Sequence, residues 1–213
     1  MKKAAHRDDV YWAKPVPGFG DVEARVLILG LAPAAHGANR TGRVFTGDGV
    51  GASGDFLMAA LNRAGLANIP TSQHADDGLS LTGIYIAAAV RCAPPGNKPS
   101  PGEIATCLDH LDAEVAMLPH IEVVVALGKI AWDAWLALWA RQGFAPRPKP
   151  RFGHGVVASA PLSVGSGQLA VRQVVGCFHP SRQNTNTGKV TPRMYDQVFG
   201  RVVPRILAER CTT

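Results

Sequence analysis

Four continuous apolar runs divide this 213-residue chain, and they constrain its fold more than any other feature. Val, Ile and Leu dominate each run, and each run leads into a loop that contains Gly or Pro. Apolar runs without polar alternation are typical of strands that are covered on both faces. We therefore predict four buried strands, within Ala24–Pro33, Gly83–Pro95, Ile121–Gly128 and Leu169–Pro180.

Helical patterns fill the gaps between these runs. Ser100, Pro101 and Glu103 form one clear start signal, because an N-cap serine precedes a first-turn proline and a capping-box glutamate. Pro204 should end or kink the last helix, and the segment 144–168, rich in Pro, Gly and Ser, should be irregular. The predicted helices lie within Gly54–Leu66, Ser100–Leu118, Lys129–Gly143 and Thr191–Leu207.

The alternation of strands and helices predicts an α/β fold with a parallel sheet and helices on both faces. The length fits one domain over residues 1–213, with an extended lead-in at 1–20 and a tail at 208–213. In such folds the site lies beyond the carboxyl ends of the strands. We therefore expect the functional residues in the loops that follow residues 30, 91, 127 and 177.

Charge and composition suggest a partner and a compartment. Lys plus Arg number 22 and Asp plus Glu 16, and the net charge of +6 favours a polyanionic partner, although it could also serve only solubility. The N-terminal residues lack the apolar core of a signal peptide, and no run reaches the roughly 18–20 apolar residues of a membrane span. We expect a cytoplasmic, nucleoid-associated protein that is not bound to a membrane.

Three of the four loops are loaded with polar residues and turn formers. Gly30–Asp55 contains seven glycines but neither a P-loop nor a dinucleotide-binding fingerprint. Arg91–Pro101 contains four prolines, and Phe178–Arg193 has no apolar residue between Ser181 and Lys189. Phosphate binding is a natural use for the cations that these loops gather near one sheet edge. These cations are Arg40, Arg43, Arg91, Lys98, Arg182 and Lys189.

Long, irregular motifs lie in these loops, namely GLAPAAHGANRTGRVFTGD, AVRCAPPGNKP, VVALGKIAW and HPSRQNTNTG. They resemble, in order and over about residues 11–205, the motifs of type B (family 5) uracil-DNA glycosylases. The resemblance implies a three-layer α/β/α sandwich around a four-stranded parallel sheet, in agreement with the strand count above. It also implies a monomeric, monofunctional enzyme that removes uracil from DNA and leaves an abasic site, after flipping the base out of the stack.

The resemblance implies a role for three residues of the reaction site. Asp48 matches the acid that positions or activates water, His179 the histidine that bonds a uracil carbonyl oxygen, and Phe45 the aromatic ring that stacks on the base. Each has a plainer alternative. Asp48 could be a turn residue before Gly49, His179 could simply end a strand, and Phe45 could belong to the core.

Further residues are implied in contacts with the base and with DNA. Asn97 and Asn184 match polar residues of the family's site, and for each a loop-stabilising role is the alternative. The stretch HPSRQNTNTG would be a loop that enters the minor groove. The residues expected to contact DNA are Arg40, Arg43, Lys98, Ser181, Arg182, Gln183 and Lys189.

Two small residues stand where better-studied relatives carry polar ones. Ala32 replaces a general-base aspartate, and Ala88 lies near the position of an asparagine that reads pyrimidines. Loss of that amide should relax base discrimination. We therefore expect deaminated purines such as hypoxanthine to be accepted beside uracil.

The cysteines give an incomplete match. The family commonly binds a 4Fe–4S cluster, and Cys92 and Cys107 match two of its four ligands, but the Cys-x-x-Cys pair that supplies the others is absent. We expect no cofactor in the chain as given. The alternatives are a cluster completed by a longer native N-terminus, and some other metal. Cys177 falls in the fourth strand, and Cys211 falls in the tail and could conceivably reach over.

Two other functions would fit part of these features. A binding module could recognise deaminated bases without turnover or attach covalently through a histidine, but the basic insertion of the covalent relatives is not found. An enzyme that acts on free nucleosides would not need cations in three loops, and its activity would not fall steeply with salt.

Overall fold

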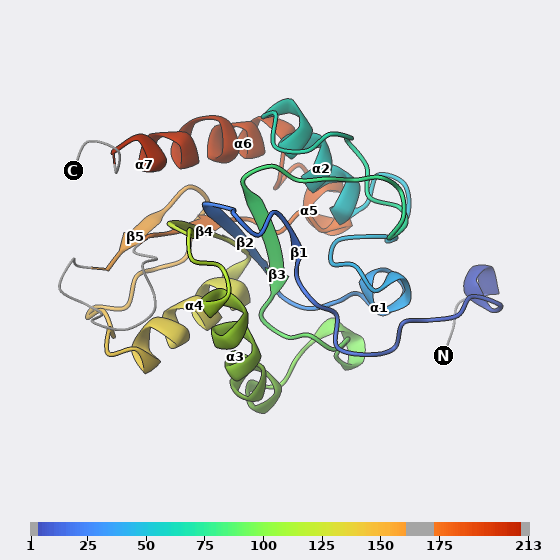
Figure 1. Cartoon of the computed structure of the whole chain (residues 1–213), viewed down its shortest axis with the longest axis horizontal. Coiled ribbons are helices and arrows are strands. Elements are labelled where there is room, and N and C mark those ends of the chain that lie inside the picture. The colour runs from blue at the N-terminus through green and yellow to red at the C-terminus, as the bar shows by residue number, and fades with distance from the viewer. Residues whose placement is uncertain (1–3, 161–172, 210–213) are drawn as a thin grey trace.

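The computed structural model describes residues 4–160 and 173–209. The predicted tail beyond residue 209, with Cys211, and the parts of the predicted lead-in and of segment 144–168 that fall in 1–3 and 161–168 lie outside the described residues. A single mixed sheet has the strand order β1-β3-β2-β4-β6-β5 (Figure 1). Its strands are β1 (Phe19–Gly20), β2 (Val26–Gly30), β3 (Ile84–Ala88), β4 (Val123–Leu127), β5 (Val157–Ser159) and β6 (Gln173–Cys177).

The four predicted strands form the parallel centre of this sheet. β2 pairs in parallel with β3 and β4, and β4 pairs in parallel with β6. All five residues of β2 and of β4 are buried, as expected for strands covered on both faces. The sheet is wider than predicted, because β1 and β5 add antiparallel edge strands. β5 also corrects the expectation that segment 144–168 is wholly irregular.

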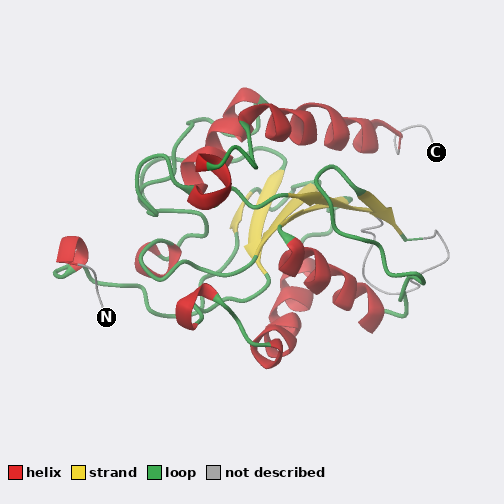
Figure 2. Ribbon diagram, turned by 180° about the vertical axis from the view of Figure 1, so that it is seen from behind, coloured by secondary structure: helices red, strands yellow, loops and turns green. Residues whose placement is uncertain are grey.

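Helices cover both faces of the sheet, which makes three layers (Figures 1 and 2). Leu27 and Leu29 of β2 face the core beneath one helical layer, and Val26 and Ile28 face the other. The first layer contains α3 (Pro101–Ala116) and α4 (Lys129–Arg141). The second contains α2 (Ser53–Arg63), α6 (Pro192–Gln197), the π-helical segment η3 (Val198–Val202) and α7 (Val203–Glu209).

The predicted start of α3 is confirmed in detail. The Glu103 N–H donates to Ser100 Oγ at 3.2 Å, and the Ser100 N–H donates to Glu103 Oε2 at 2.6 Å, so the capping box is closed. Pro204, in contrast, does not end the last helix. The π-helical segment before it changes the hydrogen-bond register, which allows a residue without an N–H to continue into α7.

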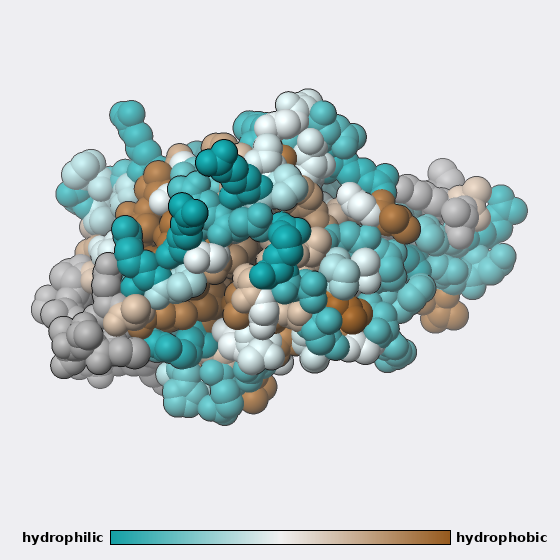
Figure 3. Space-filling model, turned by 90° about the horizontal axis from the view of Figure 1, so that it is seen from above, coloured by the Kyte–Doolittle hydropathy of each residue, from teal (hydrophilic) through white to brown (hydrophobic). Residues whose placement is uncertain are grey.

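The described residues also form the short helix η1 (Ala4–His6) before the first strand. Short helices in the connections are α1 (Ala38–Thr41), η2 (Pro95–Asn97) and α5 (Arg182–Asn186). The last of these corrects the expectation of a loop between Ser181 and Lys189. In Figure 1, α1, α2 and α5 lie at the same end of the sheet. The face seen from above is mostly hydrophilic, with hydrophobic residues visible between polar ones (Figure 3). None of the helices in the described residues is long and apolar enough to cross a membrane.

Candidate active site

A cavity of about 250 Å³ opens where the parallel strands end. The loops that follow β2 and β6, the end of β3 and the segment η2 all contribute to its wall, as expected for this fold. Its lining is largely apolar and small, with a few polar groups. The polar lining residues are Asp48, Ser53, Asn97, His179 and Ser181.

Phe45 lines this cavity, and its backbone belongs to a strained turn. Its φ of +52° lies in the left-handed region, which is costly for a residue with a side chain. Two glycines make room for it. A Cβ at Gly54 would overlap the Phe45 carbonyl oxygen, and a Cβ at Gly30 would lie 2.8 Å from Phe45 Cε2. The Phe45 ring is tilted by 32° against the His179 ring, with 6.0 Å between centroids, so both rings face one space.

Asp48 stands between two cavities. It lines the apolar cavity and also a second one of about 530 Å³, whose wall includes His6, His36 and His74. Gly37 lies directly against the Asp48 side chain, since a Cβ there would overlap Oδ1. Asp48 therefore borders both cavities.

His179 follows β6 and is held through its backbone. Asn184 Nδ2 donates to the His179 carbonyl oxygen at 2.8 Å, and the Asn184 N–H donates to Ser181 Oγ, which caps α5. Burial lowers the pKa of His179 to about 4, because an imidazolium is poorly solvated there. The ring is therefore neutral at neutral pH and can donate one hydrogen bond.

Asn184 makes a loop-stabilising contact, and its base contact stays a prediction. Its amide N–H groups turn toward the His179 backbone, and Asn184 is not among the residues that line the apolar cavity. The loop-stabilising alternative describes it better. Asn97, with φ of +57°, lies at the rim where both cavities meet.

His154 was assigned no role from the sequence. Its Nδ1 accepts from the Phe178 N–H at 3.2 Å, and its Nε2 lies 3.1 Å from the Met194 carbonyl oxygen. Because Nδ1 accepts, Nε2 carries the proton, and burial lowers the pKa of His154 in keeping with this neutral form. Tyr195 Oη donates to the Phe178 carbonyl oxygen at 2.8 Å. The residue before His179 is thus fixed at both backbone groups.

The predicted DNA-contacting residues separate into an outer and an inner group. Lys98, Arg182, Gln183 and Lys189 are exposed, and Ser181 lines the cavity. Arg182 Nη2 lies 3.5 Å from the Asp48 carbonyl oxygen, at the cavity mouth. These side chains can meet a phosphate backbone at the rim.

Arg43 and Arg40 belong to the inner group. The prediction that Arg43 contacts DNA is wrong, because its side chain is only 6% exposed and its guanidinium is bound to Asp77. Arg40 is also turned inward. Its guanidinium donates to Asp9 Oδ2, to the His36 carbonyl oxygen and to the Gly47 carbonyl oxygen.

Two alanines form part of the cavity wall. Ala32 and Ala88 both line the apolar cavity. The cavity wall at these two positions presents methyl groups and no side-chain amide.

The described residues do not make a metal site by themselves. Within 4–160 and 173–209, no group of three His, Cys, Asp or Glu side chains is arranged to hold a metal ion. Cys92 is exposed, Cys107 on α3 is half-buried, and Cys177 is buried in β6. Cys92 and Cys107 alone fall short of the four thiolates that a 4Fe–4S cluster needs. The expectation of no cofactor, and the alternative of a cluster completed by other residues, both stay untested.

The three-layer α/β/α fold brings an aspartate, a neutral histidine and an aromatic ring together at one cavity beyond the ends of the parallel strands, and this combination defines a class. The chain belongs to the uracil DNA glycosylase superfamily, whose family model matches residues 17–202. Its relatives include three proteins named type-5 uracil-DNA glycosylase, which confirms the resemblance to that type.

The relative from Mycobacterium bovis is 53% identical over 200 residues, which cover 93% of this chain and 69% of that protein. The relative from Mycobacterium leprae is 50% identical over 93% of this chain and 81% of its own length. The relative from Thermus thermophilus is 50% identical over 93% of this chain and 83% of its own length.

Proposed function

We propose that this protein is a monofunctional DNA glycosylase that hydrolyses the N-glycosidic bond of uracil in DNA and leaves an abasic site. The observation that carries the proposal is the meeting of Phe45, Asp48 and His179 at one cavity of a superfamily fold. We propose that the protein acts as a monomer on DNA in the cytoplasm.

Each of the three residues has a task in this reaction. The flipped base stacks on Phe45. Neutral His179 donates a hydrogen bond to the carbonyl oxygen that gains negative charge as the bond between C1′ and the base breaks. Asp48 holds a water molecule and stabilises the oxocarbenium-like sugar. The water oxygen bonds to C1′, its proton passes to Asp48, and the base leaves with the electron pair.

The proposal is tested with end-labelled duplexes that contain one uracil, followed by hot alkali. We expect breaks at the uracil that require alkali, because the enzyme leaves an intact abasic sugar. Breaks without alkali would contradict a monofunctional enzyme. A gel shift without breaks would favour the second candidate, a binding module, which the exposed cations alone would also support.

We also propose a broad base range. The wall at Ala32 and Ala88 lacks an amide that would reject a purine, and one good hydrogen-bonding partner is what usually supplies strong discrimination. Duplexes with hypoxanthine should therefore be cleaved after alkali as well. Release of uracil with no release of hypoxanthine would refute this part of the proposal.

The rim cations should give binding that depends on salt. Lys189, which is exposed and lies 5.7 Å from the Phe178 ring centroid, is a clear candidate for a phosphate contact. Replacing Lys189 with alanine should reduce the slope of log affinity against log salt by about 1, equally for uracil-containing and normal duplexes. Lys149, which pairs with Asp133 on α4, provides a control cation away from the cavity. An unchanged slope in Lys189→Ala would remove Lys189 from the interface.

Gly37 should be needed for the position of Asp48. In Gly37→Ala the new methyl group must displace the carboxylate, and displacements of about 1 Å near the reacting atoms can cost about 100-fold in rate. We expect kcat to fall by that order. The matched control is Gly102→Ala in α3, where the nearest atom to a Cβ is Ser100 Oγ at 4.0 Å. Full kcat in Gly37→Ala would show that Asp48 need not stay where it lies.

A further inference from the structure

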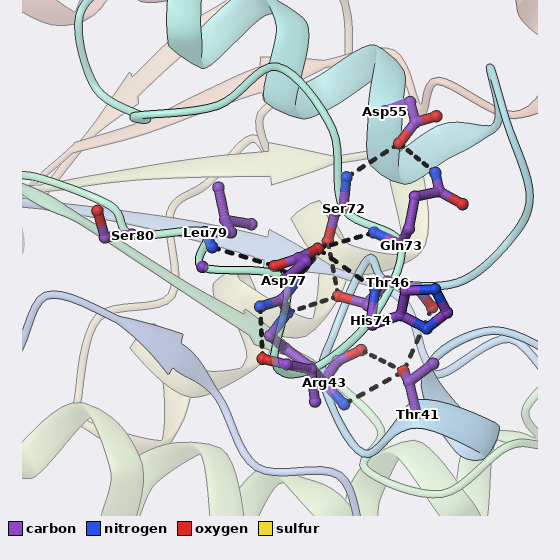
Figure 4. Close-up of polar contacts among 12 residues, drawn as sticks. Thr41, Arg43, Thr46, Asp55, Ser72, Gln73, His74, Asp77, Leu79 and Ser80 are labelled. Carbon is purple, nitrogen blue, oxygen red and sulfur yellow. Dashed lines mark hydrogen bonds and ion pairs between the residues drawn. The ribbon is translucent and has the colours of Figure 1, made fainter.

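An ion pair between Arg43 and Asp77 lies beside the turn that carries Phe45 and Asp48 (Figure 4). We propose that Arg43 and Asp77 are positioning residues, which set this turn so that both side chains meet the base and the sugar. The proposal rests on the proposed function. Neither Arg43 nor Asp77 lines either cavity, so each would act only through the turn.

The pair is buried and well bonded. Arg43 Nη2 lies 2.8 Å from Asp77 Oδ1 and 2.7 Å from Oδ2, and the two side chains are 6% and 13% exposed. The other two guanidinium nitrogens also donate hydrogen bonds. Nη1 donates to the Ala75 carbonyl oxygen at 3.0 Å, and Nε donates to Thr46 Oγ1 at 2.8 Å. One side chain therefore joins the loop of residues 72–79 to the turn of residues 43–48.

Asp77 organises the loop of residues 72–79. It accepts hydrogen bonds from the N–H groups of Gln73 at 2.9 Å, His74 at 3.3 Å and Leu79 at 3.1 Å. Burial alone would raise the pKa of Asp77, but the hydrogen bonds from Arg43 and from these backbone groups outweigh it and lower the pKa. The carboxylate is thus ionised at neutral pH and holds the loop closed around the guanidinium.

Two short contacts join the loop held by the pair to the residues just before Asp48, and Arg40 adds a third contact independently of the pair. Thr46 Oγ1 and Ser72 Oγ lie 2.7 Å apart, and the Gly47 N–H donates to the Ser72 carbonyl oxygen at 3.0 Å. Arg40 Nη2 donates to the Gly47 carbonyl oxygen at 3.1 Å. The peptide groups on both sides of Gly47 are therefore fixed immediately before Asp48.

A second anchor ties the same loop to α2. Asp55 Oδ1 accepts from the Ser72 N–H at 3.0 Å and from Gln73 Nε2 at 2.6 Å, while Oδ2 accepts from the Gly51 N–H. Two of these contacts hold Ser72 and Gln73 against Asp55 in the first turn of α2 (Figure 4). They hold the loop when the ion pair is weakened, so a mild change at Arg43 should shift the turn without unfolding the protein.

The test variant is Arg43→Lys, which keeps the charge but loses the planar fork that binds Asp77 and Thr46 together. For uracil release from duplex DNA we expect kcat to fall by about 10- to 100-fold with little change in KM, because misplacement of reacting groups acts on the chemical step. Asp77→Asn, which keeps the shape and one acceptor, should have a similar but smaller effect.

The matched control is Glu114→Gln. Glu114 is 4% exposed and forms a buried pair with Arg91, with Oε2 lying 2.6 Å from Nη2, but it lines neither cavity. Its loss should lower the melting temperature and leave kcat of the folded enzyme unchanged. If Arg43→Lys behaves like Glu114→Gln, with lower stability and full kcat, the pair is merely structural and the proposal is overturned.

A readout without activity separates this proposal from the proposed function. Hydrogen exchange of the Gly47 amide reports whether the bond to Ser72 is held. Protection should fall at Gly47 in Arg43→Lys while the β4 amides stay protected. Unchanged protection at Gly47 overturns the proposal, whether or not the wild-type protein releases uracil. If the wild-type protein releases no uracil but the Gly47 amide loses its protection in Arg43→Lys, only the proposed function is refuted.

Discussion

Replacing Asp48 with asparagine is expected to lower kcat for uracil release by about 10²- to 10⁴-fold, the range that a positioned acid or base contributes. The amide keeps the shape of the side chain against Gly37 but carries no negative charge and accepts no proton from water. It therefore loses both the stabilisation of the sugar cation and the activation of water. Single-turnover rates with excess enzyme would measure this loss without contribution from product release.

Asp109→Asn, at an exposed position on α3, provides the control for the loss of a carboxylate. This variant should match the wild-type rate. Binding of the uracil duplex by Asp48→Asn should persist, because the rim cations are untouched. If Asp48→Asn retained the wild-type rate, Asp48 would be only a turn-forming residue.

The second large effect is expected at His179. Replacing it with alanine removes a donor aimed at the developing negative charge, and removal of one such donor typically costs about 10²- to 10³-fold in kcat. His179→Gln should recover part of the loss, because its amide can still donate a hydrogen bond. Equal rates for His179→Ala and wild-type protein would leave His179 as a residue that only ends the strand.

The pH dependence follows from the lowered pKa of His179. Since this pKa is about 4 in the folded protein and 6.5 for an unperturbed histidine, the unfolded chain binds more protons between these values. The contribution of His179 to stability is therefore present above pH 6.5 and is lost as the pH falls toward 4. The melting temperature of the wild-type protein should fall more steeply over this window than that of His179→Gln. Parallel curves would contradict a neutral, buried imidazole.

Patterns that depend on neighbouring residues were predictable from the sequence. The apolar run around Val26–Gly30 has no polar alternation, which predicted a strand covered on both faces. Ser100 and Glu103 predicted the start of α3. Phe45, Asp48 and His179 follow strand ends, which placed them at one edge of the sheet, and the resemblance supplied their roles.

Features that depend on distant partners were not predictable. Arg43 had the position of a phosphate-binding residue, but its partner Asp77 lies 34 residues further along the chain, and nothing in the local sequence indicates that they meet. His154 likewise acts on a strand end 24 residues away. The short strand β5 forms because it pairs with β6, although its own segment is rich in Pro and Gly.

The most direct test of the central claim is a crystal structure of Asp48→Asn bound to a duplex with one uracil. The account predicts that the uracil leaves the base stack and lies on the Phe45 ring, with a carbonyl oxygen within hydrogen-bonding distance of His179. A uracil that stays paired in the helix, or that binds away from Phe45 and His179, would contradict the assignment of this cavity as the site of base excision.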